Sequence, residues 1–226
     1  MKKMAWLCAG LLALVSIGAN AQIRYQEGKD YVALPQTLDE GKAPKVIEFF
    51  WFGCPHCYAI EPAVVNWVQN KPEAIEFEKV PAASGSWKTG AQLFYTLKAL
   101  NLDLNQAVFD EANRNLAIVR NPKAAAEFVA KNSTVTVEEF DKAWNSFGVA
   151  QQLKRAEEMF EQSGFEGVPS FMVNGKYGAT MTEKPSQLFE KIEFMALHMG
   201  EKAAEEPKAE EAKPEEVKTE AAPVAQ

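Results

Sequence analysis

A nearly continuous run of apolar and aromatic residues leads directly into a pair of cysteines. Residues 46–52 read Val-Ile-Glu-Phe-Phe-Trp-Phe and are followed by Gly53, a composition typical of a central strand buried on both faces. The segment Cys54-Pro55-His56-Cys57 comes next, and residues 54–69 show helical spacing with a proline suited to the first turn. The chain must therefore fold so that both cysteines lie at the start of a helix that follows a buried strand.

Further strand patterns lie on either side of a long helical region. Residues 74–80 alternate enough to predict a second strand, which completes a strand-helix-strand unit. Residues 169–173 and 176–180 flank Asn174-Gly175, a strong signal for a two-residue hairpin turn. A last helix is expected over residues 184–199, where apolar side chains share one face.

The region between these groups, residues 84–163, shows helical periods and no convincing strand. Within it, Thr136 and Glu139 match a capping box. This order of elements predicts an α/β sheet domain interrupted by an all-helical insertion. The sheet domain is expected to comprise residues 22–83 and 164–200.

The N-terminus has the pattern of an export signal. Lys2 and Lys3 precede an apolar run, and Ala19-Asn20-Ala21 supplies a small-x-small cleavage site. Residues 1–21 are therefore predicted to be a signal peptide that is cleaved. Lipid attachment at Cys8 is the less favoured alternative, because a bulky leucine precedes that cysteine.

The C-terminus differs equally from the rest of the chain. Residues 201–226 contain eight Glu, four Lys and three Pro, and a segment so poor in large apolar side chains is expected to be disordered. The whole chain carries a formal charge of −7, and removal of the signal peptide would leave 22 basic against 31 acidic residues. No basic patch favours binding to nucleic acid.

Signal-peptide cleavage would leave Cys54 and Cys57 as the two cysteines of the mature chain. A disulfide between them closes a loop too short to stabilise the fold much through chain entropy. Secreted scaffolds that depend on disulfides carry several cysteines at wide spacings. The pair is therefore better explained by redox chemistry than by structural cross-linking.

Thiol:disulfide exchange needs an accessible sulfur that leaves readily as a thiolate, and a second thiol within reach. With Cys54 as N-cap and Pro55 as the first helical residue, the Cys54 sulfur would face unpaired N–H groups at the positive end of the helix dipole. His56 could add a hydrogen bond or a positive charge; the alternative is an exposed loop histidine. Cys57 lies one turn further in, where burial would keep it a thiol.

A zinc or copper site is the rival interpretation of the cysteine pair. Structural zinc usually takes four protein ligands, whereas the mature chain offers two cysteines and two histidines. His56 is poorly placed to share one metal with both neighbouring sulfurs, and His198 belongs to the predicted last helix. We therefore expect no metal site.

Three motifs together resemble one known family. The segment 49–58, Phe-Phe-Trp-Phe-Gly-Cys-Pro-His-Cys-Tyr, together with Gly167-Val168-Pro169 and Val173-Asn174-Gly175-Lys176-Tyr177, is similar to the DsbA family of bacterial periplasmic dithiol oxidases. The resemblance covers about residues 23–199. It implies a thioredoxin-like fold with a helical insertion, a location in the periplasm of a Gram-negative bacterium, and no cofactor beyond the redox-active disulfide itself.

The resemblance also implies roles for residues outside the cysteine motif. Pro169 would follow a cis peptide bond facing the disulfide, where sequence alone allows an ordinary trans loop proline. Val168 would offer backbone hydrogen bonds to an extended substrate. Glu48 would be a buried acid that moves protons to and from Cys57, and Lys79, on the strand predicted beside it, would belong to the same catalytic set. The alternatives are that Glu48 faces solvent at a strand end or forms a structural ion pair with Lys79.

These features predict a monomeric dithiol oxidase that passes the Cys54-Cys57 disulfide to reduced exported proteins. Apolar and backbone contacts around Pro55 and Pro169 would bind the substrate. The resemblance implies that a DsbB-type, quinone-linked inner-membrane protein restores the disulfide. A reductase or isomerase would use the same residues at a lower reduction potential. A third, non-enzymatic alternative is a chaperone or binding module, whose effect in the cell would persist after Cys54→Ser.

Overall fold

The computed structural model describes residues 24–38, 44–182 and 184–199. The predicted signal peptide and the predicted acidic tail lie outside these residues. Among the described residues, no helix is long and apolar enough to cross a membrane.

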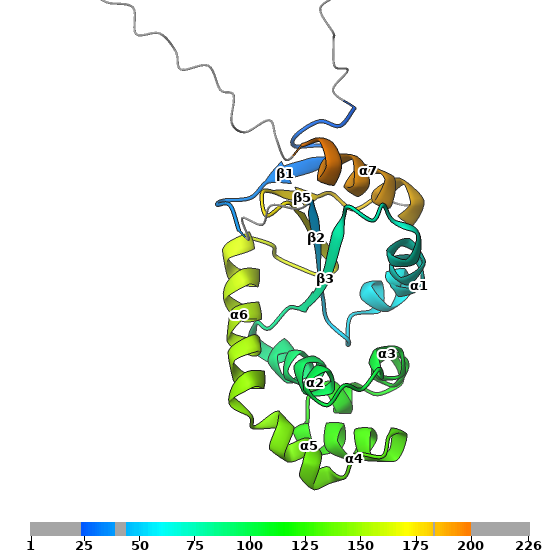
Figure 1. The fold of residues 1–226 in the computed structure, drawn as a ribbon, viewed down its shortest axis with the longest axis vertical. Coiled ribbons are helices and arrows are strands. Elements are labelled where there is room, and N and C mark those ends of the chain that lie inside the picture. Colours follow the sequence, from blue (N-terminus) through cyan, green and yellow to red (C-terminus); the bar gives the residue numbers. More distant parts are fainter. Residues whose placement is uncertain (1–23, 39–43, 183, 200–226) are drawn as a thin grey trace, which may run out of the picture.

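The described part of the chain forms one mixed sheet with strand order β1-β5-β4-β2-β3 (Figure 1). The strands are β1 (Tyr31–Ala33), β2 (Lys45–Phe50), β3 (Glu76–Pro81), β4 (Ser170–Val173) and β5 (Tyr177–Ala179). β2 pairs in parallel with β3 and antiparallel with β4, and the other neighbours are antiparallel. The central position of β2 confirms the inference from its apolar run, because a strand with neighbours on both edges and layers on both faces has no exposed surface.

The central strand ends earlier than the sequence predicted. Trp51 and Phe52 remain buried but lie outside β2. The backbone N–H of Cys54 donates to the carbonyl of Trp51 at 3.0 Å. This turn redirects the chain into the next helix. Trp51 and Phe52 therefore stay inside the protein although they no longer pair with a neighbouring strand.

The β4–β5 hairpin turns at the predicted residues. Asn174 and Gly175 have φ values of 52° and 65°, and the N–H of Lys176 donates to the carbonyl of Val173 at 3.1 Å. Positive φ at both central residues is the geometry that favours an Asn-Gly pair. The edge strand β1 was not predicted from the sequence, because three residues are too few for a period-two pattern to be recognised.

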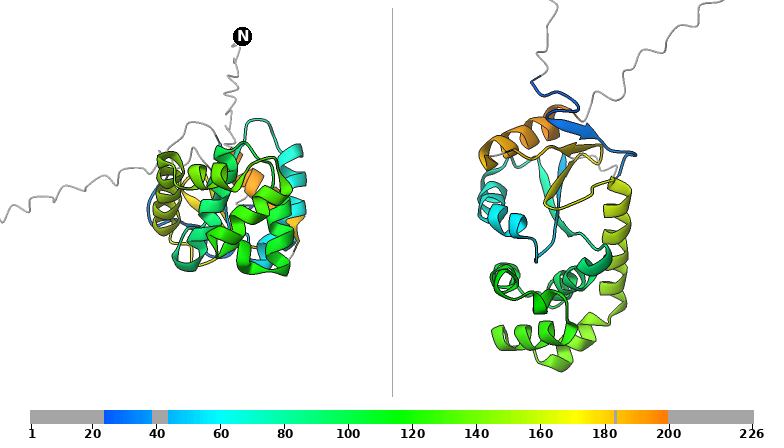
Figure 2. Two further views of the ribbon diagram at one scale, coloured as in Figure 1. Left: turned by 90° about the horizontal axis from the view of Figure 1, so that it is seen from below. Right: turned by 180° about the vertical axis from the view of Figure 1, so that it is seen from behind.

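Helices cover both faces of the sheet (Figures 1 and 2). The helices are α1 (Pro55–Asn70), α2 (Lys88–Ala99), α3 (Asn105–Arg114), α4 (Pro122–Asn132), α5 (Val137–Trp144), α6 (Phe147–Ser163) and α7 (Pro185–His198), with short 3-10 turns η1 (Gly85–Trp87) and η2 (Leu116–Val119). Between Gly85 and Ser163 the described elements are all α-helices or 3-10 helices, which confirms the helical insertion. Its exact boundaries stay a prediction.

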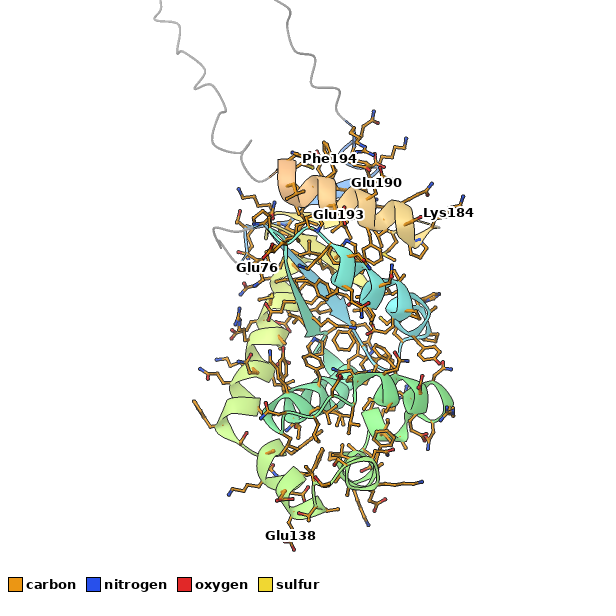
Figure 3. All side chains as sticks on the ribbon, turned by 45° about the vertical axis from the view of Figure 1, so that its right-hand side comes forward. Glu76, Glu138, Lys184, Glu190, Glu193 and Phe194 are labelled. Atoms are coloured by element: carbon orange, nitrogen blue, oxygen red, sulfur yellow. The ribbon has the colours of Figure 1, made fainter. Side chains whose placement is uncertain are left out.

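Two apolar clusters fill the space between the layers. One cluster joins α1 and α7 to one face of the sheet and includes Val46, Trp67, Phe171 and Ile192. The other cluster joins the insertion helices to the sheet. Figure 3 shows the side chains of both layers filling the interior. Because successive strand residues point to opposite faces, Glu48 shares the face of Val46, on the side where α1 packs.

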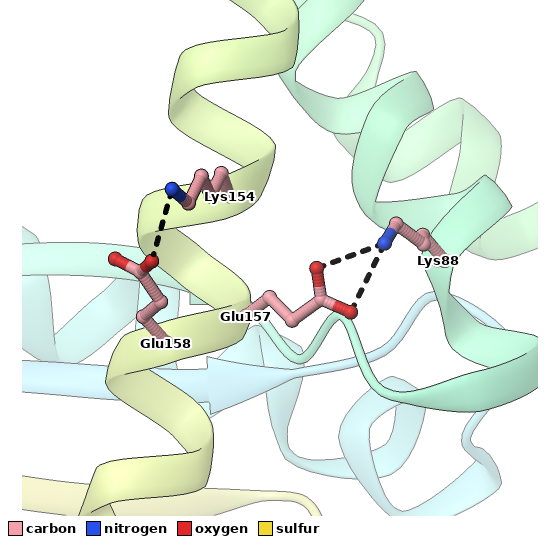
Figure 4. Close-up of polar contacts among 4 residues, drawn as sticks. All are labelled: Lys88, Lys154, Glu157 and Glu158. Atoms are coloured by element: carbon pink, nitrogen blue, oxygen red, sulfur yellow. Dashed lines mark hydrogen bonds and ion pairs between the residues drawn. The ribbon is translucent and has the colours of Figure 1, made fainter.

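Polar contacts cap one helix and join two others in the insertion. Thr136 and Glu139 form the predicted capping box at the start of α5, which satisfies two backbone donors at the helix terminus. Lys88 of α2 donates to both carboxylate oxygens of Glu157 in α6, at 3.0 and 2.8 Å (Figure 4). An exposed ion pair of this kind contributes little, on the order of 0–1 kcal/mol.

Candidate active site

The cysteine pair begins helix α1. Cys54 is its N-cap, with φ −90° and ψ 118°, and Pro55 occupies the first helical turn. Pro55 has no N–H to leave unsatisfied there, and its ring holds φ near the helical value. The predicted placement of both residues is therefore confirmed, and the Cys54 sulfur lies at the positive end of the helix dipole.

The two thiols have opposite environments. Cys54 is half-buried, whereas Cys57 is completely buried, and both are free cysteines. The Cys57 thiol donates a hydrogen bond to Cys54 and, with the backbone N–H groups of Cys57 and His56 and the charge of His56, lowers the pKa of Cys54 to about 6. These N–H groups point toward the Cys54 sulfur, although none of them meets the geometry of a capping hydrogen bond.

The causes of the lowered Cys54 pKa include one that the sequence analysis did not name. The helix terminus and His56 were expected to stabilise the thiolate, and both do act in that direction. The strongest contribution comes instead from the Cys57 side chain. Burial raises the pKa of the Cys57 thiol, and donation to Cys54 raises it further. The second cysteine therefore keeps its own proton and stabilises the thiolate of the first.

Val168 and Pro169 approach the cysteines from a distant part of the chain. The peptide bond between them is cis, as the resemblance implied. The Val168 carbonyl oxygen lies 3.3 Å from the Cys54 sulfur and accepts its hydrogen bond. Backbone hydrogen-bonding groups are thus available beside the reactive sulfur.

A cluster of three charged residues lies beneath the active-site helix. Glu48 is completely buried, and its Oε2 lies 3.4 Å from Nζ of Lys79, its direct neighbour in the β2–β3 register. Lys79 also forms an ion pair and hydrogen bond with Glu61, and its Nζ lies 4.8 Å from the centre of the Phe50 ring. The possibility that Glu48 faces solvent is excluded, and the possibility of an ion pair with Lys79 is confirmed.

The charge state of Glu48 is set mainly by burial. Desolvation raises its pKa to about 7, against the opposing attraction of Lys79, and the nearby Glu61 charge raises it too. Apart from the ion pair with Lys79, neither carboxylate oxygen has a hydrogen-bond partner among the described residues. A buried acid that titrates near neutral pH can accept or release a proton there, since both of its forms are populated.

Glu61 was missed by the sequence analysis. It lies in α1 four residues after Cys57, and residues four apart share a helix face. Because Cys57 was expected to face the protein interior, the same spacing could have placed Glu61 there. An acidic residue on a helix surface is usually solvated, so the spacing by itself carried little weight.

An apolar groove lies beside the cysteines. It has a volume of about 620 Å³ and is lined by residues from α1, from the loop at Pro169, and from the segment between β5 and α7. His56 and Pro169 contribute to its lining, as do Met181 and Thr182. His56 is exposed, so it can contact a substrate that occupies this groove.

The structure thus brings the predicted site residues together at one end of α1. Among the described residues, no group of three or more His, Cys, Asp or Glu is arranged to hold a metal ion. A thioredoxin-like sheet that presents a Cys-x-x-Cys pair at a helix N-terminus, with a cis-proline loop against the first sulfur, defines a thiol:disulfide exchange protein.

Comparison with known proteins identifies the family. Residues 38–192 match the family model described as "Thioredoxin". Thiol:disulfide interchange protein DsbA of Pseudomonas aeruginosa is 35% identical over 178 residues, covering 76% of this chain and 84% of that protein. The DsbA of Azotobacter vinelandii is 37% identical over 155 residues, covering 66% of this chain and 72% of that protein. A crystal structure of Pseudomonas aeruginosa DsbA has a TM-score of 0.71 and 32% identity, covering 80% of this chain and 96% of that one. The chain belongs to the DsbA family.

Proposed function

We propose that this protein is a periplasmic dithiol oxidase that donates a Cys54–Cys57 disulfide to exported proteins as they fold. The observation that carries the proposal is the asymmetry of the two thiols. The accessible Cys54 has a pKa lowered to about 6, and the buried Cys57 has a raised pKa. Stabilising the Cys54 thiolate stabilises the reduced protein, since the thiolate exists only there, and this makes the disulfide a stronger oxidant.

The reaction begins from the oxidised protein. A substrate thiolate attacks the Cys54 sulfur, a bond forms between these two sulfurs, and the Cys54–Cys57 bond breaks. Cys57 leaves as a thiolate and takes up a proton. A second substrate thiolate then attacks the substrate sulfur of the mixed disulfide, and Cys54 leaves as a thiolate. Two electrons pass from the substrate to the protein, and the substrate gains its disulfide.

Glu48 is the proposed proton donor for the leaving Cys57 sulfur. Both groups are buried, and the charge of Glu48 raises the pKa of Cys57, so the two groups influence each other. A carboxyl with a pKa of about 7 gives up its proton readily to a thiolate of much higher pKa. We assign Lys79 the supporting role of holding the negative charge that then remains on Glu48.

Substrates are proposed to bind as extended segments beside the disulfide. The Val168 carbonyl lies within hydrogen-bond distance of the Cys54 sulfur, so backbone groups of Val168 are available to a substrate segment that reaches Cys54. Pro55 and Pro169 would contribute apolar contacts beside the attacked sulfur. The backbone contacts in this mode require no particular side chain in the substrate, which suits a catalyst of many different exported proteins.

The reduced protein has to be reoxidised after each turnover. A DsbB-type inner-membrane protein linked to quinone is the proposed oxidant, and the protein is proposed to act as a monomer without a bound cofactor. The same residues could serve a reductase or isomerase if the reduction potential were low. No particular observation favours that direction, and the lowered pKa of Cys54 opposes it.

The decisive experiment titrates the purified protein against glutathione and measures oxidation of a reduced, unfolded substrate. We expect a potential closer to the −120 mV of DsbA than to the −270 mV of thioredoxin, and stoichiometric oxidation of the substrate. Cys57→Ser has no internal disulfide, so it should not oxidise the reduced substrate but should form a mixed disulfide between Cys54 and oxidised glutathione, releasing one glutathione thiolate. Cys54→Ser should be inactive in both reactions. A thioredoxin-like potential, or a cellular effect that survives Cys54→Ser, would reject the proposal.

A further inference from the structure

A buried cation lies outside the active site. Lys191 in α7 is only 1% exposed, and its Nζ donates a hydrogen bond to the backbone carbonyl of Thr180 at 2.6 Å. Burying an ammonium group is costly, and an apolar side chain of similar length would fill the same space at lower cost. The contact with Thr180 is therefore the feature that a lysine, and not a methionine or leucine, provides at this position.

The Thr180 carbonyl belongs to a junction of three elements. Thr180 follows the last residue of β5, and its backbone N–H donates to the carbonyl of Asp30 at 3.0 Å, just before β1 begins. Burial lowers the pKa of Lys191, and the charge of Asp30 acts in the opposite direction. The N–H of Thr180 is thus bonded to the residue before β1, and its carbonyl is bonded to α7.

The residues that follow this junction line the active-site groove. Met181 and Thr182 contribute to the groove that His56 and Pro169 also line, and 42% of the Met181 surface is exposed. The Thr182 hydroxyl donates to the carbonyl of Lys184 at 3.1 Å. Figure 3 marks Lys184 at the start of α7, with Glu190, Glu193 and Phe194 further along the helix.

We propose that Lys191 is a positioning residue for substrate binding, which fixes Met181 and Thr182 in the groove that His56 and Pro169 also line, by holding the Thr180 carbonyl. The favoured ligand is an extended peptide with an apolar side chain close to its cysteine, because most of this groove is apolar. The proposal rests on the proposed function, since it concerns how the oxidase selects peptides. It adds a residue that touches neither the substrate nor the cysteines.

The test compares two kinds of thiol substrate with Lys191→Met. The oxidised variant should react with reduced glutathione at the wild-type rate, because the cysteines and their surroundings are unchanged. With a cysteine peptide that carries a leucine beside the cysteine, KM should rise while kcat stays the same. The rise should be at most about tenfold, because binding can lose no more than the free energy of the one hydrogen bond that holds Thr180. The reason for the rise is that the Thr180 carbonyl loses its hydrogen-bond partner in this variant, so Met181 and Thr182 are no longer held in place in the groove.

Lys71→Met is the matched control. Lys71 also donates from Nζ to a backbone carbonyl, that of Ile75, but it follows the far end of α1, about 24 Å along the helix from the cysteines. This variant should leave both substrates unaffected. Equal KM values for wild type and Lys191→Met, or the same change with glutathione as with the peptide, would overturn the proposal. Failure of the wild type to oxidise either substrate would instead reject the proposed function.

A measurement on the unaltered protein covers the case in which Lys191→Met does not fold. The peptide, with serine in place of its cysteine, is titrated into oxidised wild-type protein while carbon NMR signals of the Met181 methyl and the Lys191 side chain are followed. We expect both signals to shift with one binding curve, although Lys191 is buried. A shift of Met181 without any shift of Lys191 would overturn the proposal.

Discussion

Glu48 and Lys79 lie side by side on neighbouring parallel strands, with the carboxylate oxygen 3.4 Å from the ammonium nitrogen. Lys79 is shared, because it also pairs with Glu61 from the helix that carries the cysteines. One cation thus serves two buried acids. Attraction to a shared cation only partly offsets desolvation, which is why the pKa of Glu48 is raised and not lowered.

Replacing Glu48 with Gln should stabilise the protein at high pH. The pKa of Glu48 rises from 4.5 to about 7 on folding, so the folded state holds this proton more tightly than the unfolded state. The resulting stability is fully present below pH 4.5 and is lost as pH rises to 7. Denaturant unfolding of the oxidised proteins, whose thiols do not titrate, should favour Glu48→Gln by about 3 kcal/mol at pH 8. A pH-independent difference between the variants would contradict this assignment.

Replacing Lys79 with Met should have the opposite effect. The change leaves Glu48 and Glu61 buried without their cation, and loss of one partner from a buried pair costs about 3–5 kcal/mol. The loss should be largest at pH 8 and smaller at pH 5, where Glu48 is protonated. Glu48→Gln should stabilise the Lys79→Met protein more than it stabilises the wild type, because a buried Glu48 charge is costlier without its cation. If the effects of the two changes simply add, the two residues are not coupled.

Substitutions of His56 separate its charge from its backbone N–H. Both lower the pKa of Cys54, so His56→Ala should raise that pKa and His56→Pro, which also removes the N–H, should raise it further. The reduction potential should become more negative in the same order, by about 30 mV for each 1.4 kcal/mol of lost thiolate stabilisation. Ultraviolet thiolate absorbance against pH and glutathione titration provide the two measurements. An unchanged Cys54 pKa in both variants would assign the whole effect to Cys57 and the helix.

Gly53 should not tolerate alanine. A Cβ at this position would lie 2.5 Å from the Trp51 ring, and that ring is buried. Relieving the overlap should cost about 1–3 kcal/mol and displace Cys54, so the thermal midpoint and the oxidation rate should both fall. Gly148→Ala is the control, because nothing lies within 4 Å of its added Cβ in α6. Equal stability of the two variants would show that Trp51 moves freely.

The amino-acid sequence was sufficient where local periodicity and turn chemistry decide the structure. The apolar run before Cys54 predicted the central strand, Asn174-Gly175 predicted the hairpin turn, and Thr136 with Glu139 predicted a helix start. In each case the residues that make the structure are close neighbours in the chain. Their backbone preferences therefore act before any distant contact forms.

Tertiary structure decided the chemistry of the site. Val168 meets the Cys54 sulfur from 114 positions away, and the approach was expected only because the motif resembles a known family. The pairing of Glu61 with Lys79 and the link from Lys191 to the groove wall depend on which surfaces pack together. Whether an acid is solvated or titrates near neutral pH is set by the removal of water around it. That removal is a property of the packed layers, and no local pattern in the chain encodes it.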